Sequence, residues 1–194
     1  MRSASGRICL LPFDREDIPL VEGWFHDRET CELAFGVKAP WDVLSTIRAE
    51  YMEELQKDTT GVLSVKGVPA GGMSGPHPPN PSTIGFVRYS LFSKDKKKQA
   101  RVGIILGPPA LRGSGLGREA FGTLVNYLFR ERAVTAIELD TALFNTRARG
   151  CFEACGFEAV RETEFLSINA QWKERRLVMR LEKAKWESFQ TPID

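Results

Sequence analysis

The sequence has few of the residues that hold metals or build disulfide frameworks. Its 194 residues include four cysteines and two histidines. This cysteine density is too low for a secreted disulfide scaffold, and at most one histidine, His26 or His77, can join any cysteine in a metal site. We therefore expect reduced thiols, a cytoplasmic protein and no bound metal.

Long apolar runs and a strong charge bias are also absent. No stretch approaches the roughly 18 apolar residues that span a bilayer, and the apolar run near the start is too short for a signal peptide. The 27 lysines and arginines against 25 aspartates and glutamates leave a net charge of +2. This bias is too weak to favour nucleic acid or an anionic membrane as a partner. An anionic ligand must therefore be held by a local arrangement of groups.

Glycine and proline are neither scarce nor abundant overall, but they are unevenly placed. Residues 67–81 read GVPAGGMSGPHPPNP, in which nine of fifteen residues are Gly or Pro. Such a segment can neither hold a helix nor feed a sheet ladder. We expect a long surface loop here, either a tolerated insertion, which is the commoner case, or a lid over a substrate pocket.

Hydrophobic periodicity on either side of this loop predicts both helices and strands. Apolar residues recur every three or four positions after Asp17, Asp42 and Gly117, as on one face of a helix. The polar stretch 93–99 between two β-type runs predicts an antiparallel hairpin with a basic turn. The expected strands cover 8–11, 62–65, 84–92, 100–106, 137–141 and 177–181. Two expected helices begin at 17 and 42, and two more cover 117–132 and 147–155. This order indicates an α/β layer fold with a largely antiparallel first half.

The most informative segment is a glycine-rich turn at 104–118, between an apolar strand and the strongest helix. Its glycines let a phosphate approach the backbone, and the helix N-terminus offers unpaired N–H groups and a positive dipole end. Arg112 or Arg118 can add charge. The turn lacks the Lys-Ser/Thr of a Walker A loop, and Arg118 stands where the dinucleotide fingerprint needs its third glycine. It therefore predicts an anion site of another kind, or else only a tight turn.

This turn resembles the pyrophosphate loop of the GCN5-related N-acetyltransferases (GNAT), which reads Gln/Arg-x-x-Gly-x-Gly/Ala; residues 112–117 match it as Arg-Gly-Ser-Gly-Leu-Gly. The residues around Asp17 and at 24–27 are similar to the branch that includes ribosomal-protein N-terminal and antibiotic or amino-sugar acetyltransferases. The likeness continues downstream through Asn145, Ala148, Phe152, Glu153, Gly156 and Phe157.

The resemblance implies a fold and a domain organisation. Family members have a mixed, mostly antiparallel central sheet with helices on both faces. In this chain the likeness covers residues 8–182, which we therefore expect to form a single domain that carries the loop at 67–81. Residues 183–194 would then be a C-terminal tail.

The resemblance also implies acetyl-CoA as cosubstrate, bound where the strands 100–106 and 137–141 splay apart. Asn145 would bind the pantetheine arm, although an Asn here also suits a helix start. The other implied cofactor-binding residues act through their main chain: Ile104, Ile105 and Leu106 for the pantetheine, and Arg112, Gly113, Ser114, Gly115, Leu116 and Gly117 for the pyrophosphate.

The implied reaction is direct attack of a primary amine of a small molecule on the thioester, with a backbone N–H near Ile105 polarising the carbonyl. Phe152 stands where many relatives place a proton-donating Tyr, and Arg101 lies near where they often have a Glu. Strand alternation puts Asp140 on one face near the split, which makes it the preferred base, acting through water. A solvent-facing structural carboxylate is the commoner role for such a residue.

Two other functions fit the same residues. A protein N-terminus of the ribosomal-protein type can replace the small-molecule acceptor, and the departures at Phe152 and Arg101 also suit a non-catalytic acetyl-CoA sensor. We expect acetyl-CoA and an amine as partners, no nucleic acid or membrane, and a monomer or homodimer. The acceptor itself stays open, because selectivity lies in the first two helices and the loops.

Overall fold

The computed structural model of the chain describes residues 1–57, 61–67, 82–166 and 173–190. Within these ranges a seven-stranded sheet has the order β1-β2-β3-β4-β5-β7-β6. Neighbouring strands are antiparallel except β4 and β5, which are parallel. This confirms the predicted mixed, mostly antiparallel sheet. The strands are β1 (Ile8–Pro12), β2 (Val62–Gly67), β3 (Ser82–Lys94), β4 (Lys97–Leu106), β5 (Ala136–Ala142), β6 (Glu158–Leu166) and β7 (Lys173–Glu182).

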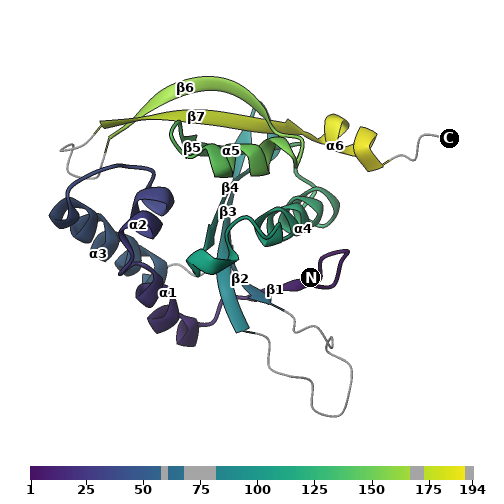
Figure 1. Cartoon of the computed structure of the whole chain (residues 1–194). Coiled ribbons are helices and arrows are strands. Elements are labelled where there is room, and N and C mark those ends of the chain that lie inside the picture. Colours follow the sequence, from purple (N-terminus) through teal and green to yellow (C-terminus); the bar gives the residue numbers. More distant parts are fainter. Residues whose placement is uncertain (58–60, 68–81, 167–172, 191–194) are drawn as a thin grey trace, which may run out of the picture.

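Helices cover both faces of the sheet, as predicted (Figure 1). The apolar stripe of α4, including Phe121, Leu124 and Leu128, is fully buried and packs with α5 and α6 against one face. The other core forms around Phe25 and Leu44, where α1–α3 cover the first strands. The helices are α1 (Ile18–Trp24), α2 (Arg28–Phe35), α3 (Trp41–Lys57), α4 (Leu116–Arg130), α5 (Thr146–Glu153) and α6 (Lys183–Gln190), with short 3₁₀ turns η1 (Arg15–Asp17) and η2 (Pro109–Leu111).

Helix α2 was not among the expected elements, although the sequence carries its end signals. The Asp27 carboxylate caps the helix by accepting a hydrogen bond from the Thr30 backbone N–H at 2.8 Å. Gly36 ends it in the left-handed conformation, with φ of 68°, which glycine adopts without steric cost. A helix of eight residues shows only two turns of periodicity, so its cap and its terminal glycine are the better guides.

The hairpin of β3 and β4 has a much tighter turn than the polar stretch 93–99 predicted. The two strands pair continuously up to Lys94 with Lys97. Asp95 and Lys96 make the turn with φ of 52° and 59°, as a two-residue hairpin connection requires. The lysines on either side are therefore strand residues.

The segment expected to be a C-terminal tail contains α6, which packs against the domain. The Trp186 side chain is buried, its ring stacks on Phe129 with centroids 5.0 Å apart, and its indole N–H donates to the Asn126 side chain at 2.9 Å. The Gly/Pro-rich loop, apart from Gly67 at the end of β2, lies outside the described residues. In the described ranges no helix is long and apolar enough to cross a membrane.

Candidate active site

The central feature of the site is a split in the sheet between β4 and β5. These parallel strands pair over three positions only, from Gln99 with Ala136 to Arg101 with Glu138. Beyond them β4 stays paired to β3 up to Leu106, while β5 stays paired to β7. The backbone edge of β4 that faces β5 is therefore left without a partner strand along its last residues.

Strand alternation decides which backbone groups of β4 face this split. The Gly107 N–H donates to the Ile84 carbonyl of β3 at 3.0 Å, and the register runs without a shift from Leu106 back along the strand. In an antiparallel pair, residues alternate between bonding the partner and facing away from it. Ile105 therefore turns its N–H and C=O toward β3, whereas Ile104 and Leu106 turn theirs toward the split. The N–H predicted near Ile105 is better supplied by either neighbour.

The glycine-rich turn after β4 is shaped by two residues in the left-handed region. Gly113 and Gly115 have φ of 79° and 84°, a conformation that other residues adopt only with strain. Gly115 leads directly into α4, which begins at Leu116. A Cβ on Gly117 would lie 3.3 Å from the Leu106 side chain, so glycine allows the start of α4 to pack closely against the end of β4.

Not every N–H of residues 112–117 is free to bind an anion. The Arg112 N–H donates to the Pro109 carbonyl at 3.0 Å, and the Ser114 N–H donates to the Leu111 carbonyl at 3.4 Å. The first N–H groups of a helix have no partner within it. Among residues 112–117, all of them described, the N–H groups left without a backbone acceptor are those of Gly113, Gly115, Leu116 and Gly117.

The Arg112 side chain holds the turn against α2 and does not point at the turn itself. Its guanidinium donates to the Glu29 carboxylate at 2.8 Å and to the Thr30 hydroxyl at 2.5 Å. Asp27 lies 3.7 Å away, and its pKa is lowered by hydrogen bonds from Thr30 and by the nearby Arg112 charge. Arg112 is thus a link between the turn and the helical layer, and Arg118 of α4 carries the other predicted charge.

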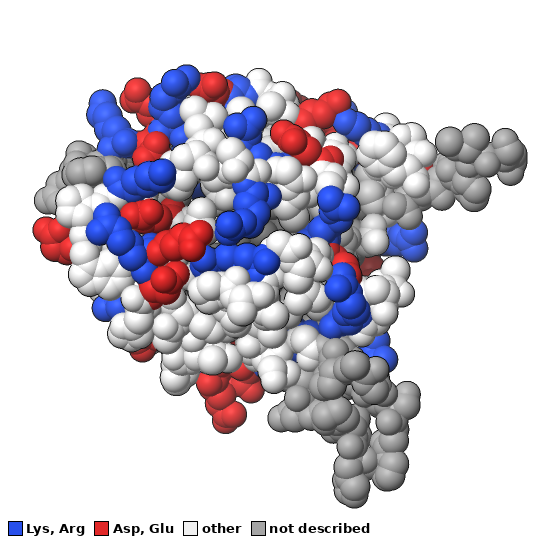
Figure 2. Space-filling view, in the orientation of Figure 1, with Lys and Arg blue, Asp and Glu red and all other residues white. Residues whose placement is uncertain are grey.

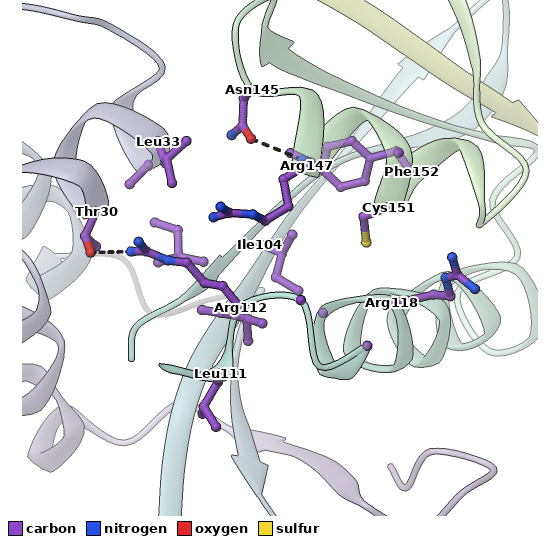
Figure 3. Close-up of a pocket in the computed structure, with 18 residues that line it drawn as sticks. Thr30, Leu33, Ile104, Leu111, Arg112, Arg118, Asn145, Arg147, Cys151 and Phe152 are labelled. Atoms are coloured by element: carbon purple, nitrogen blue, oxygen red, sulfur yellow. Dashed lines mark hydrogen bonds between the residues drawn. The ribbon is translucent and has the colours of Figure 1, made fainter. Parts of the chain in front are cut away.

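A cleft of about 320 Å³ opens above the turn, between α2, β4, α4 and α5. Basic side chains gather across the middle of this face, beside a group of acidic ones (Figure 2). Arg112 reaches across the cleft to Thr30, and Arg147 of α5 lies on the opposite wall (Figure 3). The Arg147 guanidinium lies 3.7 Å from Glu29. The cleft therefore has backbone N–H groups without acceptors at its floor and basic groups at its rim.

Asn145 lines this cleft from the end of β5, where the sequence placed it. Its side-chain oxygen accepts the Ala148 N–H at 3.1 Å and so caps α5. The helix-start role that the sequence allowed is therefore real. The residue is 9% exposed, and its amide also faces the space where the cleft joins a second cavity.

The second cavity has a volume of about 560 Å³ and lies under α2 and α3, against the strands on either side of the split. Ile104, Ile105, Ala148 and Phe152 line both cavities, so the two meet at the split. Side chains from several strands and helices line the second cavity, among them Tyr51, Phe86, Arg88, Arg101, Asp140 and Arg176.

Asp140 and Glu138 share a face of β5, as alternation predicted, but each is bound to an arginine of β7. The Asp140 carboxylate lies 2.5 Å from the Arg176 guanidinium. Glu138 is buried and lies 2.6 Å from Arg180. Only Asp140 reaches the second cavity. The charge of the Asp140 carboxylate is therefore already matched by Arg176.

Phe152 lies at the junction of the cavities, where the resemblance places a Tyr in many relatives. Its ring is buried against Phe121, with centroids 4.8 Å apart, and offers no proton. The neighbouring Cys151 faces the cleft. A hydrogen bond from Cys155 lowers the pKa of the Cys151 thiol, aided by the Arg118 charge and opposed by burial.

Sequence reasoning named some of the residues that line the second cavity, such as Asp140 and Arg101, but missed others. The sequence assigned no functional role to Tyr51, Arg88 or Arg176. Burial raises the pKa of the Tyr51 phenol, which stays protonated beside the Arg88 guanidinium, 5.4 Å from its ring. Within the described residues, no group of three or more His, Cys, Asp or Glu side chains could hold a metal ion.

The sequence model of the acetyltransferase (GNAT) domain matches residues 7–158. The chain belongs to the GNAT acetyltransferase family. This agrees with the resemblance first seen in the glycine-rich turn.

Solved structures with the same fold are distant in sequence. A GNAT acetyltransferase from Bacillus anthracis has a TM-score of 0.68 at 13% identity, with 92% of this chain and 96% of that chain covered. Aminoglycoside acetyltransferase AAC(6')-Ib, in complex with ribostamycin and coenzyme A, has 0.67 at 18%, covering 95% and 98%. Spermidine N-acetyltransferase from Vibrio cholerae, with CoA and spermine, has 0.64 at 18%, covering 93% and 98%.

Proposed function

We propose that this protein transfers the acetyl group of acetyl-CoA to a primary amine of a small molecule by direct attack. The observation that carries the proposal is the pair of cavities that meet at the β4–β5 split, one of which has backbone N–H groups without acceptors at its floor. A two-substrate transfer needs two binding spaces that share one reacting point. The aminoglycoside and spermidine acetyltransferases of the same fold act on such amines by their names.

The cleft fits the phosphate and pantetheine parts of acetyl-CoA. The pyrophosphate would lie on the N–H groups of Gly113, Gly115, Leu116 and Gly117, which have no backbone acceptor. The unpaired edge of β4 offers the N–H and C=O of Ile104 and Leu106 to the amide groups of the pantetheine. Asn145 lines the same cleft and would bind the pantetheine arm through its side-chain amide.

The reacting point would lie where both cavities touch β4. A backbone N–H of Ile104 or Leu106 would polarise the thioester carbonyl, because both face the split. The amine would arrive from the second cavity, past Ala148 and Phe152. Since Phe152 has no proton to give, we propose that the thiolate leaves without a dedicated acid at this position.

Asp140 remains our candidate for receiving the proton of the amine, through a water molecule. It is the carboxylate that lines the second cavity within the described residues, and its side chain is 38% exposed. Water can therefore reach it. Asp140→Asn should slow the reaction and change its pH profile; an unchanged rate and profile would remove Asp140 from the mechanism.

An assay of the purified protein tests the whole proposal. Acetyl-CoA is mixed with a panel of primary amines and short peptides, and both free CoA thiol and acetylated products are measured. Acetylated small amines support the proposal, and acetylated peptides alone would support the protein N-terminal alternative. Tight CoA binding without any product would favour a non-catalytic sensor, and absence of CoA binding would overturn all three.

A further inference from the structure

The second cavity is lined by arginines that come from distant parts of the chain. Arg88 of β3, Arg101 of β4 and Arg176 of β7 lie on the sheet face that α1–α3 partly cover, and Arg132 joins them from beyond the end of α4. Asp140 is the carboxylate that lines the cavity within the described ranges. With a net charge of only +2 over the whole chain, this is a local concentration of positive charge.

Internal ion pairs neutralise part of this charge. Asp140 is paired with Arg176. Arg88 lies 3.3 Å from Glu54, whose side chain is 63% exposed, so water screens that pair. Arg101 has no carboxylate partner among the described residues, and its guanidinium carbon lies 5.9 Å from the Phe92 ring centroid. Arg101 is exposed, so its positive charge near the split is open to a ligand as well as to water.

The sign of this charge bears on the acceptor. Arginines that line a partly enclosed cavity repel a polycation and attract an anion, because charges interact more strongly there than in bulk water. Arginine also binds carboxylates through two parallel hydrogen bonds. The spermidine and aminoglycoside enzymes of the same fold take polycationic amines by their names, and this cavity is poorly suited to such molecules.

We propose that the acceptor is a small amine that carries a carboxylate, in the manner of an α-amino acid. This inference rests on the proposed function and specifies its second substrate. The carboxylate is held by Arg101, with Arg88 nearby, and the amine lies toward the split and Asp140. A cavity of about 560 Å³ limits the molecule to amino-acid or dipeptide size, and the rings of Tyr51 and Phe86, 6.5 Å apart, offer an apolar wall to its side chain.

Matched pairs of acceptors test the charge requirement. L-phenylalanine and L-leucine are compared with their carboxamides, which differ only in the carboxylate, and with spermidine and ribostamycin. We expect kcat/KM to favour each amino acid over its amide by about tenfold or more, as one charge-assisted contact allows. The amide has the more easily deprotonated amine, so such a preference cannot arise from amine basicity.

Arg101→Gln tests the residue. It should raise KM for the amino acids by about tenfold, leave KM for the amides unchanged and leave CoA affinity unchanged. Arg101→Lys keeps the charge and should restore part of the preference. Arg175→Gln is the matched control, because Arg175 is an exposed arginine beside Arg176 that does not line the cavity.

The transferase function and the carboxylate preference can fail independently, so acetylation and binding are measured separately. Calorimetry with CoA-bound protein measures the binding of L-phenylalanine and of its amide. If amines are acetylated but amides or polyamines are used as well as amino acids, the carboxylate inference is wrong and the transferase function stands. If no amine is acetylated, the transferase function fails. Arg101-dependent binding of L-phenylalanine over its amide would then still support the anion site, and equal binding of both would overturn it.

Discussion

The two cavities that meet at the split are built in different ways. The floor of the cleft over the glycine-rich turn comes from one continuous segment, 104–117, while side chains of α2 and α5 form its walls. The second cavity is made from side chains that the fold collects from α3, β3, β4, β5 and β7. A backbone site tolerates change in most of its side chains but fails when its glycines change. In a side-chain site, a single substitution can change the charge and therefore the kind of ligand that binds.

The largest effect should come from breaking the backbone site at Gly115. Valine is β-branched and is strained at φ of 84° by about 1–3 kcal/mol, so Gly115→Val should force the turn to rearrange. We expect the CoA affinity, measured by titration calorimetry, to fall about a hundredfold, which corresponds to the upper end of that range of strain energy. The matched control is Gly122→Ala in the same helix, where a Cβ meets nothing within 4 Å. Unchanged CoA affinity in Gly115→Val would mean that the anion does not rest on this turn.

The second cavity depends instead on how α1–α3 are anchored to the sheet, and Asp17 is one anchor. Its carboxylate accepts hydrogen bonds from Ser64 at 2.8 Å, Lys66 at 2.9 Å and Thr83 at 2.8 Å. Burial raises its pKa, but these bonds and the Lys66 charge outweigh burial and bring the pKa below the ordinary 3.8. The ionised form is therefore the one that stabilises the fold.

Asp17→Asn should lower the free energy of unfolding by about 1–2 kcal/mol at pH 7. A depressed folded-state pKa gives stability that is present above the ordinary pKa and is lost as the pH falls through the folded value. The difference between the two proteins should therefore shrink below about pH 4. Urea unfolding at pH 7 and pH 3 measures it, with Asp42→Asn as a reference for losing a carboxylate at a helix start. A difference that stays constant with pH would contradict the assignment.

Cysteine reactivity gives a milder test of the cleft, without changing the protein. Hydrogen bonding from Cys155 lowers the Cys151 pKa, whereas burial raises that of Cys31 to about 11. Cys151 should therefore be alkylated before Cys31 at neutral pH, as peptide mass mapping can follow. Saturating CoA should slow its alkylation by about fivefold, since the ligand covers it. Equal rates with and without CoA would place the ligand elsewhere.

The same contrast explains what the sequence could and could not predict. The turn at 112–117 was readable because its glycines, the preceding strand and the following helix are adjacent in sequence. The charge of the second cavity was not, because Arg88, Arg101 and Arg176 share no local pattern and meet only through the order of the strands. Strand alternation placed Asp140 on the right face but could not show that Arg176 binds it.

Side-chain direction was the other limit. The sequence offered Arg112 as a charge for the phosphate site, yet its guanidinium binds Glu29 and Thr30 of α2. Helix α2 has only two turns and was not predicted, so Glu29 and Thr30 could not be predicted as the partners of Arg112. The direction of the β4 backbone groups was predicted only in part. The sequence assigned the same role to Ile104, Ile105 and Leu106, but the register of β3 and β4 shows that Ile104 and Leu106 face the split and Ile105 does not.

The smallest expected effect concerns the rim of the cleft, where charged side chains should contribute to CoA binding beside the backbone groups. Glu29 pairs with both Arg112 and Arg147, and its side chain is 57% exposed. In Glu29→Gln, Arg112 keeps Thr30 and Asp27, so the turn stays anchored. Arg147 is released and one negative charge leaves the mouth of an anion site. CoA should therefore bind about twofold tighter at low salt, because an exposed pair is worth at most about 1 kcal/mol.

Glu32→Gln in the same helix is the control, since Glu32 pairs with Arg28 and does not line the cleft. Calorimetric titration with CoA at two ionic strengths distinguishes the explanations. A gain that disappears at high salt is the electrostatic effect expected of a rim charge. A loss of affinity at both salt concentrations would instead mean that Glu29 holds Arg112 and the turn in place, so that even the backbone site depends on one side chain from α2.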